Sequence, residues 1–431
     1  MTISDRNDEP ASGTGANFPL SPVRRALVLS VFMGLMVVNL LDRQIVAILA
    51  EPMRLELGLS DSQIGILSGL VFAIFYSTFA LPIGRLADRY DRVYILSAAA
   101  AGWSLMTAAC GLAGNFIHLA LARIGVAVGE AGGVPPAHSL ISDYFPPERR
   151  ARAIAIMQLG APIGVFLALV AGGWIAENYG WRNAFIIVAI PGLFVAIAAL
   201  LVLPEPRRHS IAAKATYATD ETFVRALLGL LALKGMKPIL AGGVFAAFAV
   251  YSVVAWLPVF FQRIFEWSPG ETGAILGPVI GVAGLIGTWA GGAIGDRWRQ
   301  NDKGGQVRIA MLAPLFAAPL FAAGALMPVD MVALALLALP CLFYAVFQAP
   351  LAAAVQNIAP AARRALASSL FIFSLNFLGL GLGPTSVGFL SDFLHTSYGD
   401  DSLRYALLLV PAAGLASAAF LWLGYRALRQ A

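Results

Sequence analysis

Charged residues are scarce in this chain: Asp, Glu, Lys and Arg make up 12% of its 431 residues. A soluble domain carries about 25% charged residues, so most of this surface must face something other than water. Apolar runs near the ~20 residues that cross about 30 Å of hydrocarbon recur along the whole length. We therefore expect an integral, multi-pass membrane protein whose principal partner is the lipid bilayer.

Cysteine and histidine are too few and too scattered for a catalytic or metal site. Cys110 and Cys341 both fall inside apolar runs, which excludes a disulfide framework and favours small buried side chains. The four histidines show no zinc spacing or triad order, and no glycine-rich loop ends in Gly-Lys-Ser/Thr. We expect no enzyme, no catalytic residue, no metal and no cofactor.

The net charge of +5 is better explained by orientation than by nucleic acid. Lys and Arg gather in short loops between the apolar runs, as the positive-inside rule requires if both termini are cytoplasmic. Residues 1–23 lack a basic region leading to a short apolar core, and we expect a disordered cytoplasmic tail rather than a signal peptide. Short loops and alanine-rich helices favour a prokaryotic inner membrane.

The apolar runs predict an all-α membrane protein with twelve transmembrane helices in two pseudo-symmetric six-helix bundles. Their expected ranges are 25–48, 63–86, 93–112, 116–141, 150–175, 182–203, 238–262, 271–294, 306–326, 330–355, 363–390 and 403–425. A polar linker, 204–237, separates an N-terminal bundle (24–203) from a C-terminal bundle (238–431). The linker stretch ETFVRALLGLLALKG predicts a short interfacial helix; a plain linker is the alternative.

The two halves repeat one another. GRLADRY at 84–90 is echoed by GAIGDRW at 292–298, ERRARA at 148–153 by ARRALA at 362–367, and GWIAE at 173–177 by GFLSD at 388–392. These matches occur in the same order in both halves. Duplicated bundles with a substrate site at their interface are a transporter architecture.

The loop GRLADRYDR at 84–92 resembles the Gly-x-Leu-Ala-Asp-Arg-x-Gly-Arg motif of the major facilitator superfamily, with Asp91 in the last glycine position. The resemblance implies the major facilitator fold. It also implies that Asp88 contacts the start of helix 363–390 and that the basic residues of the loop latch onto Asp143 at the cytoplasmic end of helix 116–141. The cytoplasmic gate expected from this loop and its echo comprises Gly84, Asp88, Arg89, Arg92, Asp143, Asp296 and Arg297.

A narrower resemblance covers the first five helices. NLLDRQIVAIL at 39–49, with its paired Asp-Arg, and ARIGVAVGEAGG at 122–133, with its Gly-Glu-Ala, are similar to the Spinster branch of that superfamily. This branch is associated with sphingolipids and lysophospholipids, including sphingosine-1-phosphate, and with proton coupling in some members. Major facilitator proteins mostly work as monomers, which we expect here too.

Four ionisable residues lie inside predicted helices of the N-terminal half: Asp42, Arg43, Arg123 and Glu130. Each charge at a bilayer centre costs roughly 2.5–3.5 kcal/mol, so it needs a partner or a function. Asp42 and Arg123 fall at comparable depths and are predicted to approach each other. Glu130, seven residues from Arg123, is expected about 10 Å further along the same face. A structural salt bridge between the two helices is the alternative.

The C-terminal helices carry no deep charge, so the candidates there are aromatic or amide side chains. They are Phe245, Phe248, Tyr251, Trp256, Tyr344, Gln348, Ser374 and Asn376. A site that is charged on one wall and apolar on the other suits an amphiphile with an anionic head. We expect Arg43 and Arg123, with Tyr251, Trp256, Tyr344, Gln348 and Asn376, to bind the substrate.

These features predict a secondary active transporter of an amphiphilic anionic lipid, working by alternating access. Asp42 and Glu130 are expected to exchange protons, because opening the cavity to either side changes their desolvation and their neighbouring charges. An anionic headgroup could compete with either carboxylate for an arginine. The alternatives are a carrier for small organic anions or drugs and a non-transporting sensor with the same fold.

Overall fold

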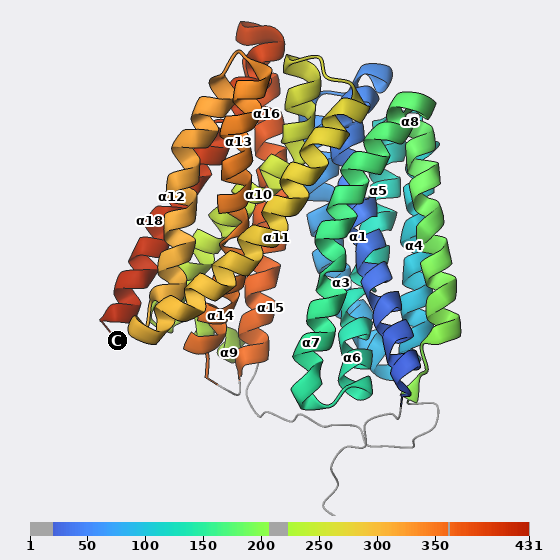
Figure 1. Ribbon diagram of the computed structural model, residues 1–431, viewed down its shortest axis with the longest axis vertical. Helices are drawn as coiled ribbons and strands as arrows, with labels where there is room; N and C mark the ends of the chain where they lie inside the picture. The colour runs from blue at the N-terminus through green and yellow to red at the C-terminus, as the bar shows by residue number, and fades with distance from the viewer. Residues whose placement is uncertain (1–19, 207–222, 361–362, 431) are drawn as a thin grey trace, which may run out of the picture.

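The computed structural model describes residues 20–206, 223–360 and 363–430, which form two groups of long helices side by side (Figure 1). Within these ranges, ten helical segments are long and apolar enough to cross a membrane. The 56-residue segment Pro147–Val202 turns at Gly180, where φ is 83°, and so crosses twice. The apolar helix Leu409–Arg429 supplies the twelfth crossing. The all-α, twelve-span prediction is confirmed.

The first six crossings precede the linker. They are built by α1 (Pro22–Leu57), α2 (Asp61–Gly65), the π-helix η1 (Ile66–Leu70), α3 (Val71–Arg89), α4 (Arg92–Gly111), α5 (Phe116–Ala131), α6 (Val134–Tyr144), α7 (Pro147–Gln158) and α8 (Gly160–Val202). The linker contains a short helix, α9 (Phe223–Leu231), in the stretch where the sequence predicts one. Residues 207–222 and most of the predicted tail lie outside the described ranges.

The last six crossings follow the linker. They are built by α10 (Met236–Ile264), α11 (Pro269–Asn301), α12 (Gly305–Leu326), α13 (Asp330–Ala345), α14 (Gln348–Ile358), α15 (Arg364–Ser374), the π-helix η4 (Leu375–Leu380), α16 (Gly381–Tyr398), η5 (Gly399–Asp401), α17 (Ser402–Ala406) and α18 (Leu409–Arg429).

Capping side chains set several helix starts. Ser21, Asp91 and Asn115 each accept a backbone N–H from the first turn of the helix that follows. Ser60 and Gln63 form a complete capping box at the start of α2. Such caps satisfy donors that a helix start leaves without a partner, which matters most where water is scarce.

Several crossings that the sequence predicts as single helices are interrupted. The span 116–141 breaks at Gly132, and η1 and η4 each insert a π-helical turn into their spans. A π-turn adds one residue to a helix and is common at functional sites. Apolar periodicity does not reveal it, because the local composition stays apolar on every side.

Twelve crossings return the chain to its starting side, so both described ends lie at the bottom of Figure 1. We call this end the termini side and the opposite end the far side. Loops after α1, α4, α10, α12 and α16 lie on the far side. Loops after α3, α6, α11 and α14 lie on the termini side.

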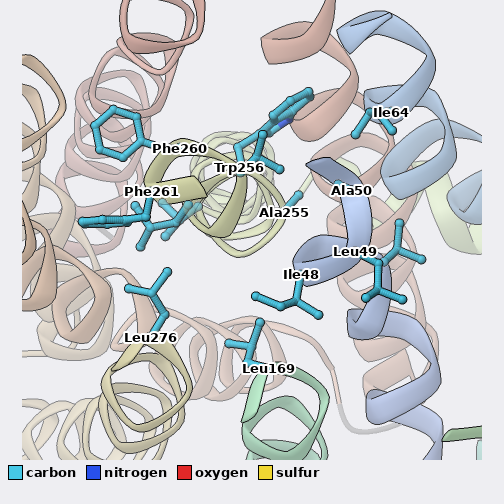
Figure 2. Packing of buried hydrophobic residues seen from close by; sticks show 14 of the residues in the cluster. Ile48, Leu49, Ala50, Ile64, Leu169, Ala255, Trp256, Phe260, Phe261 and Leu276 are labelled. Carbon is cyan, nitrogen blue, oxygen red and sulfur yellow. The ribbon is translucent and has the colours of Figure 1, made fainter. Parts of the chain in front are cut away.

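The hydrophobic core is shared between the two halves only toward the far side. One buried cluster contains residues of α1, α2 and α8 together with residues of α10 and α11. Figure 2 shows part of it, with Ile48 of α1 between Ala255 of α10 and Leu169 of α8. Toward the termini side, one cluster is formed almost entirely by the N-terminal half and another by the C-terminal half. The halves are therefore joined at the far side.

Replacing Gly173 of α8 by alanine tests this joint. A Cβ atom there would meet the carbonyl oxygen of Pro269 at the start of α11 and would lie 3.3 Å from the Cα atom of Gly273. We expect Gly173→Ala to lower the free energy of unfolding by about 1–3 kcal/mol, measured by thermal unfolding in detergent. The control Gly102→Ala has open space within 4 Å and should be neutral or stabilising. Equal melting shifts would contradict the close approach of α8 and α11.

Candidate functional site

Arg43 of α1 and Glu130 of α5 form a buried ion pair inside the N-terminal half. Both Nε and Nη2 of Arg43 donate to Oε2 of Glu130, at 3.0 and 2.6 Å. The Arg43 side chain is 14% exposed and that of Glu130 is 0% exposed. Among the described residues, Oε1 of Glu130 has no hydrogen-bond partner, so this carboxylate keeps one free oxygen beside the pair.

Arg123 of α5 contacts Asp42 of α1, but through the backbone. Its Nη1 donates to the carbonyl oxygen of Asp42 at 3.3 Å, and within the described ranges neither carboxylate oxygen of Asp42 has a hydrogen-bond partner. The Asp42 carboxylate is fully buried near Trp103 and Ser104 of α4. The predicted approach of Asp42 and Arg123 is therefore present, without a carboxylate–guanidinium bridge.

The pairing of Arg43 with Glu130 departs from the order of contacts expected from the sequence. From their depths in the predicted helices, we expected Arg123 to lie opposite Asp42 and Glu130 to lie further along the same face. The sequence analysis assigned no partner to Arg43. Successive helical residues point about 100° apart, so Asp42 and Arg43 face different neighbours. The longer Arg43 side chain reaches Glu130, whereas the short Asp42 side chain stays against α4.

Two aromatic residues of α3 complete the charged cluster and were missed from the sequence. The Phe72 ring centroid lies 4.5 Å from the Arg43 guanidinium carbon and 5.4 Å from that of Arg123. Tyr76, stacked on Phe72, lies 5.1 Å from Arg43. Two aromatics four residues apart face the same side of a helix, but packing against lipid or core produces the same signal.

Arg43 also lines a small cavity between the two halves. The cavity is about 20 Å³, which is room for about one water molecule. Its wall is formed by Arg43, Gln44, Val46, Ala47, Ser68, Tyr251, Ala255, Leu380 and Pro384. The Tyr251 hydroxyl donates to Oδ1 of Asn376 at 3.0 Å. A charged wall from the N-terminal half thus faces an aromatic and apolar wall from the C-terminal half.

The other C-terminal candidates do not line this cavity. Trp256 is buried and donates through Nε1 to the carbonyl oxygen of Pro384, which makes it part of the packing between helices. Tyr344 is buried against Phe321 within the C-terminal half. Gln348 is exposed at the start of α14. Sequence reasoning chose these side chains by polarity and size, but the direction in which each one points depends on how α10, α13 and α14 are rotated.

A second charged cluster closes the far side. Arg263 of α10 donates to the carboxylate of Glu51 on α1 and, through two nitrogens, to that of Asp61 at the start of α2. Its ion-pair distances to both acids are 2.7 Å, and all three side chains are nearly buried. The sequence analysis did not single out Arg263. We call these three residues the far-side clasp.

The start of α2 is also fixed by α16. Asp392 accepts the backbone N–H groups of Asp61 and Ser62 at 2.9 and 2.8 Å, and Ser391 donates to the Asp61 carboxylate at 2.6 Å. An acid at a helix N-terminus is favoured by the helix dipole. The far side is thus closed by bonds that join α1 and α2 of one half to α10 and α16 of the other.

At the termini side, Arg92 is the centre of a cluster within the N-terminal half. It pairs with Asp143 at 2.7 Å, the contact that the motif resemblance implies, and with Glu205 at 2.6 Å. Glu205 also accepts the Arg92 backbone N–H, so the start of the linker is tied to the start of α4. The Glu205 contact was not predicted, because nothing in the motif points to the linker.

The remaining gate candidates contact little that is described. Arg89 and Arg297 are exposed, and Gly84 has open space beside it. Asp296, also exposed, accepts a hydrogen bond from Gln306. The side chain of Asp88 lies outside what the structure describes, and so does its predicted contact with the start of the eleventh crossing.

Comparison with known proteins agrees with this geometry. The Major Facilitator Superfamily profile matches residues 32–384. An MFS-type efflux pump of Mycolicibacterium smegmatis is 33% identical over 89% of each chain, and a hexuronate transporter of Bacillus subtilis is 27% identical over 84% of this chain and 87% of its own.

Among solved structures, a bacterial homolog of the human lysosomal transporter Spinster, in an inward-facing and unoccupied conformation, superposes with a TM-score of 0.86. It is 27% identical, over 95% of this chain and 99% of that one. The chain belongs to the major facilitator superfamily of membrane transporters. Within that superfamily it is a Spinster-like transporter, a non-enzymatic carrier.

Removing Arg263 tests the far-side clasp. Arg263→Ala leaves Asp61 buried without its ion-pair partner and Glu51 paired with Arg54 alone. Removing one partner of a buried pair typically costs 3–5 kcal/mol, so we expect the far side to open. Spin labels at Leu112→Cys and Val329→Cys, exposed far-side positions on opposite halves, would report a longer distance. Arg426→Ala is the control, because Arg426 lies in the last turn of α18 and its ring contact is with Trp422 of the same helix, away from both labels. An unchanged distance in Arg263→Ala would contradict the clasp.

Proposed function

We propose that this transporter couples protons to the movement of an amphiphilic anion of the lysophospholipid or sphingosine-1-phosphate class. The observation that carries the proposal is Arg43: a partly exposed guanidinium on the cavity between the halves, held by a single carboxylate oxygen of Glu130. A guanidinium is a strong, geometrically selective binder of phosphate and carboxylate.

Competition for Arg43 supplies the coupling. An anionic headgroup that binds Arg43 displaces Glu130, whose charge is then buried without its cation. Such a carboxylate lowers its energy by taking up a proton, and Oε1 of Glu130 is free to receive one. Asp42, buried beside Arg123, is the second proton site in this scheme.

The composition of the cavity wall supports an amphiphile. Apart from Arg43, Gln44 and Ser68, the wall is apolar or aromatic, including Tyr251, Ala255, Leu380 and Pro384. A sugar acid would leave its hydroxyl groups facing apolar side chains, with a desolvation cost for each unpaired group. A lipid headgroup on Arg43 with its tail along the C-terminal wall leaves no such mismatch.

We further propose that the termini side is cytoplasmic, in a prokaryotic inner membrane, and that the protein works as a monomer. The exposed basic residues Arg85, Arg89, Arg149 and Arg297 lie on the termini side, in accord with the positive-inside rule. With this orientation the closed far side makes the described conformation inward-facing. The solved Spinster homolog of similar structure carries the same description.

A carrier for small organic anions or drugs is the second candidate. It is favoured by the relatives named as an MFS-type efflux pump and a hexuronate transporter. Arg43 could bind a sugar-acid carboxylate through the same fork. The two candidate functions differ in whether an apolar tail of the substrate lies against the apolar wall of the cavity. Transport assays with one substrate of each kind therefore distinguish them.

Neutralising Glu130 tests the proton coupling. In proteoliposomes with a pH gradient, Glu130→Gln should lower uptake of a fluorescent lysophosphatidate by about tenfold or more. The reason is that the amide, unlike the carboxylate it replaces, cannot take up and release a proton beside Arg43. Exchange of lysophosphatidate across the membrane without a gradient should be retained. Glu177→Gln, an exposed acid near the end of the fifth crossing, is the control. Gradient-driven uptake that survives Glu130→Gln would refute this role.

Substituting Arg43 tests the cargo. Arg43→Lys keeps the charge but loses the fork, so lysophosphatidate binding should weaken about tenfold, or ~1.4 kcal/mol, whereas Arg43→Gln should abolish binding. Binding is measured by thermal shift. Uptake of lysophosphatidate and uptake of glucuronate, the cargo of the second candidate function, are measured in parallel. Uptake of glucuronate without uptake of lysophosphatidate would overturn the lipid assignment and leave the second candidate.

A further inference from the structure

The π-helix η1 and Gly65, the last residue of α2, pack closely on the other half. A Cβ atom on Gly65 would lie 2.6 Å from the carbonyl oxygen of Pro384, and one on Gly69 would lie 2.8 Å from that of Leu380. The Thr385 hydroxyl of α16 lies 2.7 Å from the carbonyl oxygen of Gly381 and 3.1 Å from that of Gly65, so its one proton is shared between them. Backbone meets backbone here, so η1 must move relative to α16 whenever the two halves rotate.

Phe72 follows η1 by two residues and lies between the two arginines. Its ring is 0% exposed, with its centroid 4.5 Å from the guanidinium carbon of Arg43 and 5.4 Å from that of Arg123. A cation within about 6 Å of a ring is attracted by the ring's quadrupole, and more strongly where water is excluded. One aromatic side chain therefore holds both buried cations.

Arg123 depends on this ring more than Arg43 does. Arg43 has two hydrogen bonds to Glu130, whereas Arg123, 2% exposed, has one long bond to the Asp42 carbonyl oxygen. Within the described ranges its Nε has no partner. Movement of Phe72 would therefore displace Arg123 first and change the field at the Asp42 carboxylate beside it.

The two arginines beside Phe72 differ in their surroundings. Arg43 lines the cavity between the halves, whereas Arg123 and Asp42 are buried and do not form part of its wall. The titratable and charged groups around the Asp42–Arg123 pair are Arg43 on α1, Cys110 on α4 and Glu130 on α5. Tyr76 on α3 and Tyr251 on α10 lie near Arg43 instead.

We propose that Phe72 is a positioning residue that transmits the rotation of the halves, through η1, to the Asp42–Arg123 pair. In this role Phe72 binds neither substrate nor proton. It sets where Arg123 lies relative to Asp42 in each conformation, so that protonation and conformation change together. The inference rests on the proposed proton coupling and names the element that performs it.

The test follows far-side opening as a function of pH and needs no cargo. Spin labels at Leu112→Cys and Val329→Cys report the distance between the halves in the purified full-length protein, in acid and in alkaline buffer. Phe72→Met removes the ring at similar volume, and Phe72→Tyr keeps it. Phe185→Met is the matched control, because Phe185 is an equally buried aromatic of the same half that packs on Trp181.

We expect the parent, Phe72→Tyr and Phe185→Met proteins to change their distance distribution with pH. Phe72→Met should lose at least about nine-tenths of that change, a tenfold effect of the size expected for a desolvated cation–π contact. The Phe72→Met protein must still melt cooperatively, within a few degrees of Phe185→Met. A parent protein that does not respond to pH would refute the proposed proton coupling itself. A parent that responds, together with a Phe72→Met protein that responds equally, would overturn the role of Phe72 alone.

Discussion

Arg43 must stay paired inside a medium of low dielectric, and most of the site is arranged around that constraint. An uncompensated charge in a membrane interior costs several kcal/mol, and Glu130 and Phe72 together supply the compensation. The same pairing makes the site responsive. In the proposed function, any anion or proton that removes the charge of Glu130 from Arg43 changes the energy of the whole cluster, which would link binding to protonation.

The two-part core explains how such a local change can reach the rest of the molecule. A single cluster joins the halves on the far side, together with the clasp formed by Arg263, Glu51 and Asp61, whereas separate clusters lie toward the termini side. Opening the far side would require both the shared apolar contacts and the clasp to separate. The cavity lined by Arg43 and Tyr251 lies where the halves meet, so in the proposed function the substrate and the clasp share one interface.

Fold and cargo are fixed by different features. Relatives of similar length are named for efflux or for hexuronate transport, and a close structural match is a Spinster homolog. One scaffold therefore serves several substrates, as is general for widely used folds. The cavity of this chain has an asymmetric wall, with Arg43 on one side and Tyr251, hydrogen-bonded to Asn376, on the other.

The sequence alone determined the twelve crossings and the burial of Asp42, Arg43, Arg123 and Glu130, because both follow from apolar run length and from position along a helix. It could not assign the partners. Neighbouring residues on one helix face different ways, so only the packing of α1 against α3, α4 and α5 paired Arg43 with Glu130 and put Phe72 beside it. Contacts between helices depend on their rotation and depth, and those are properties of the assembled bundle.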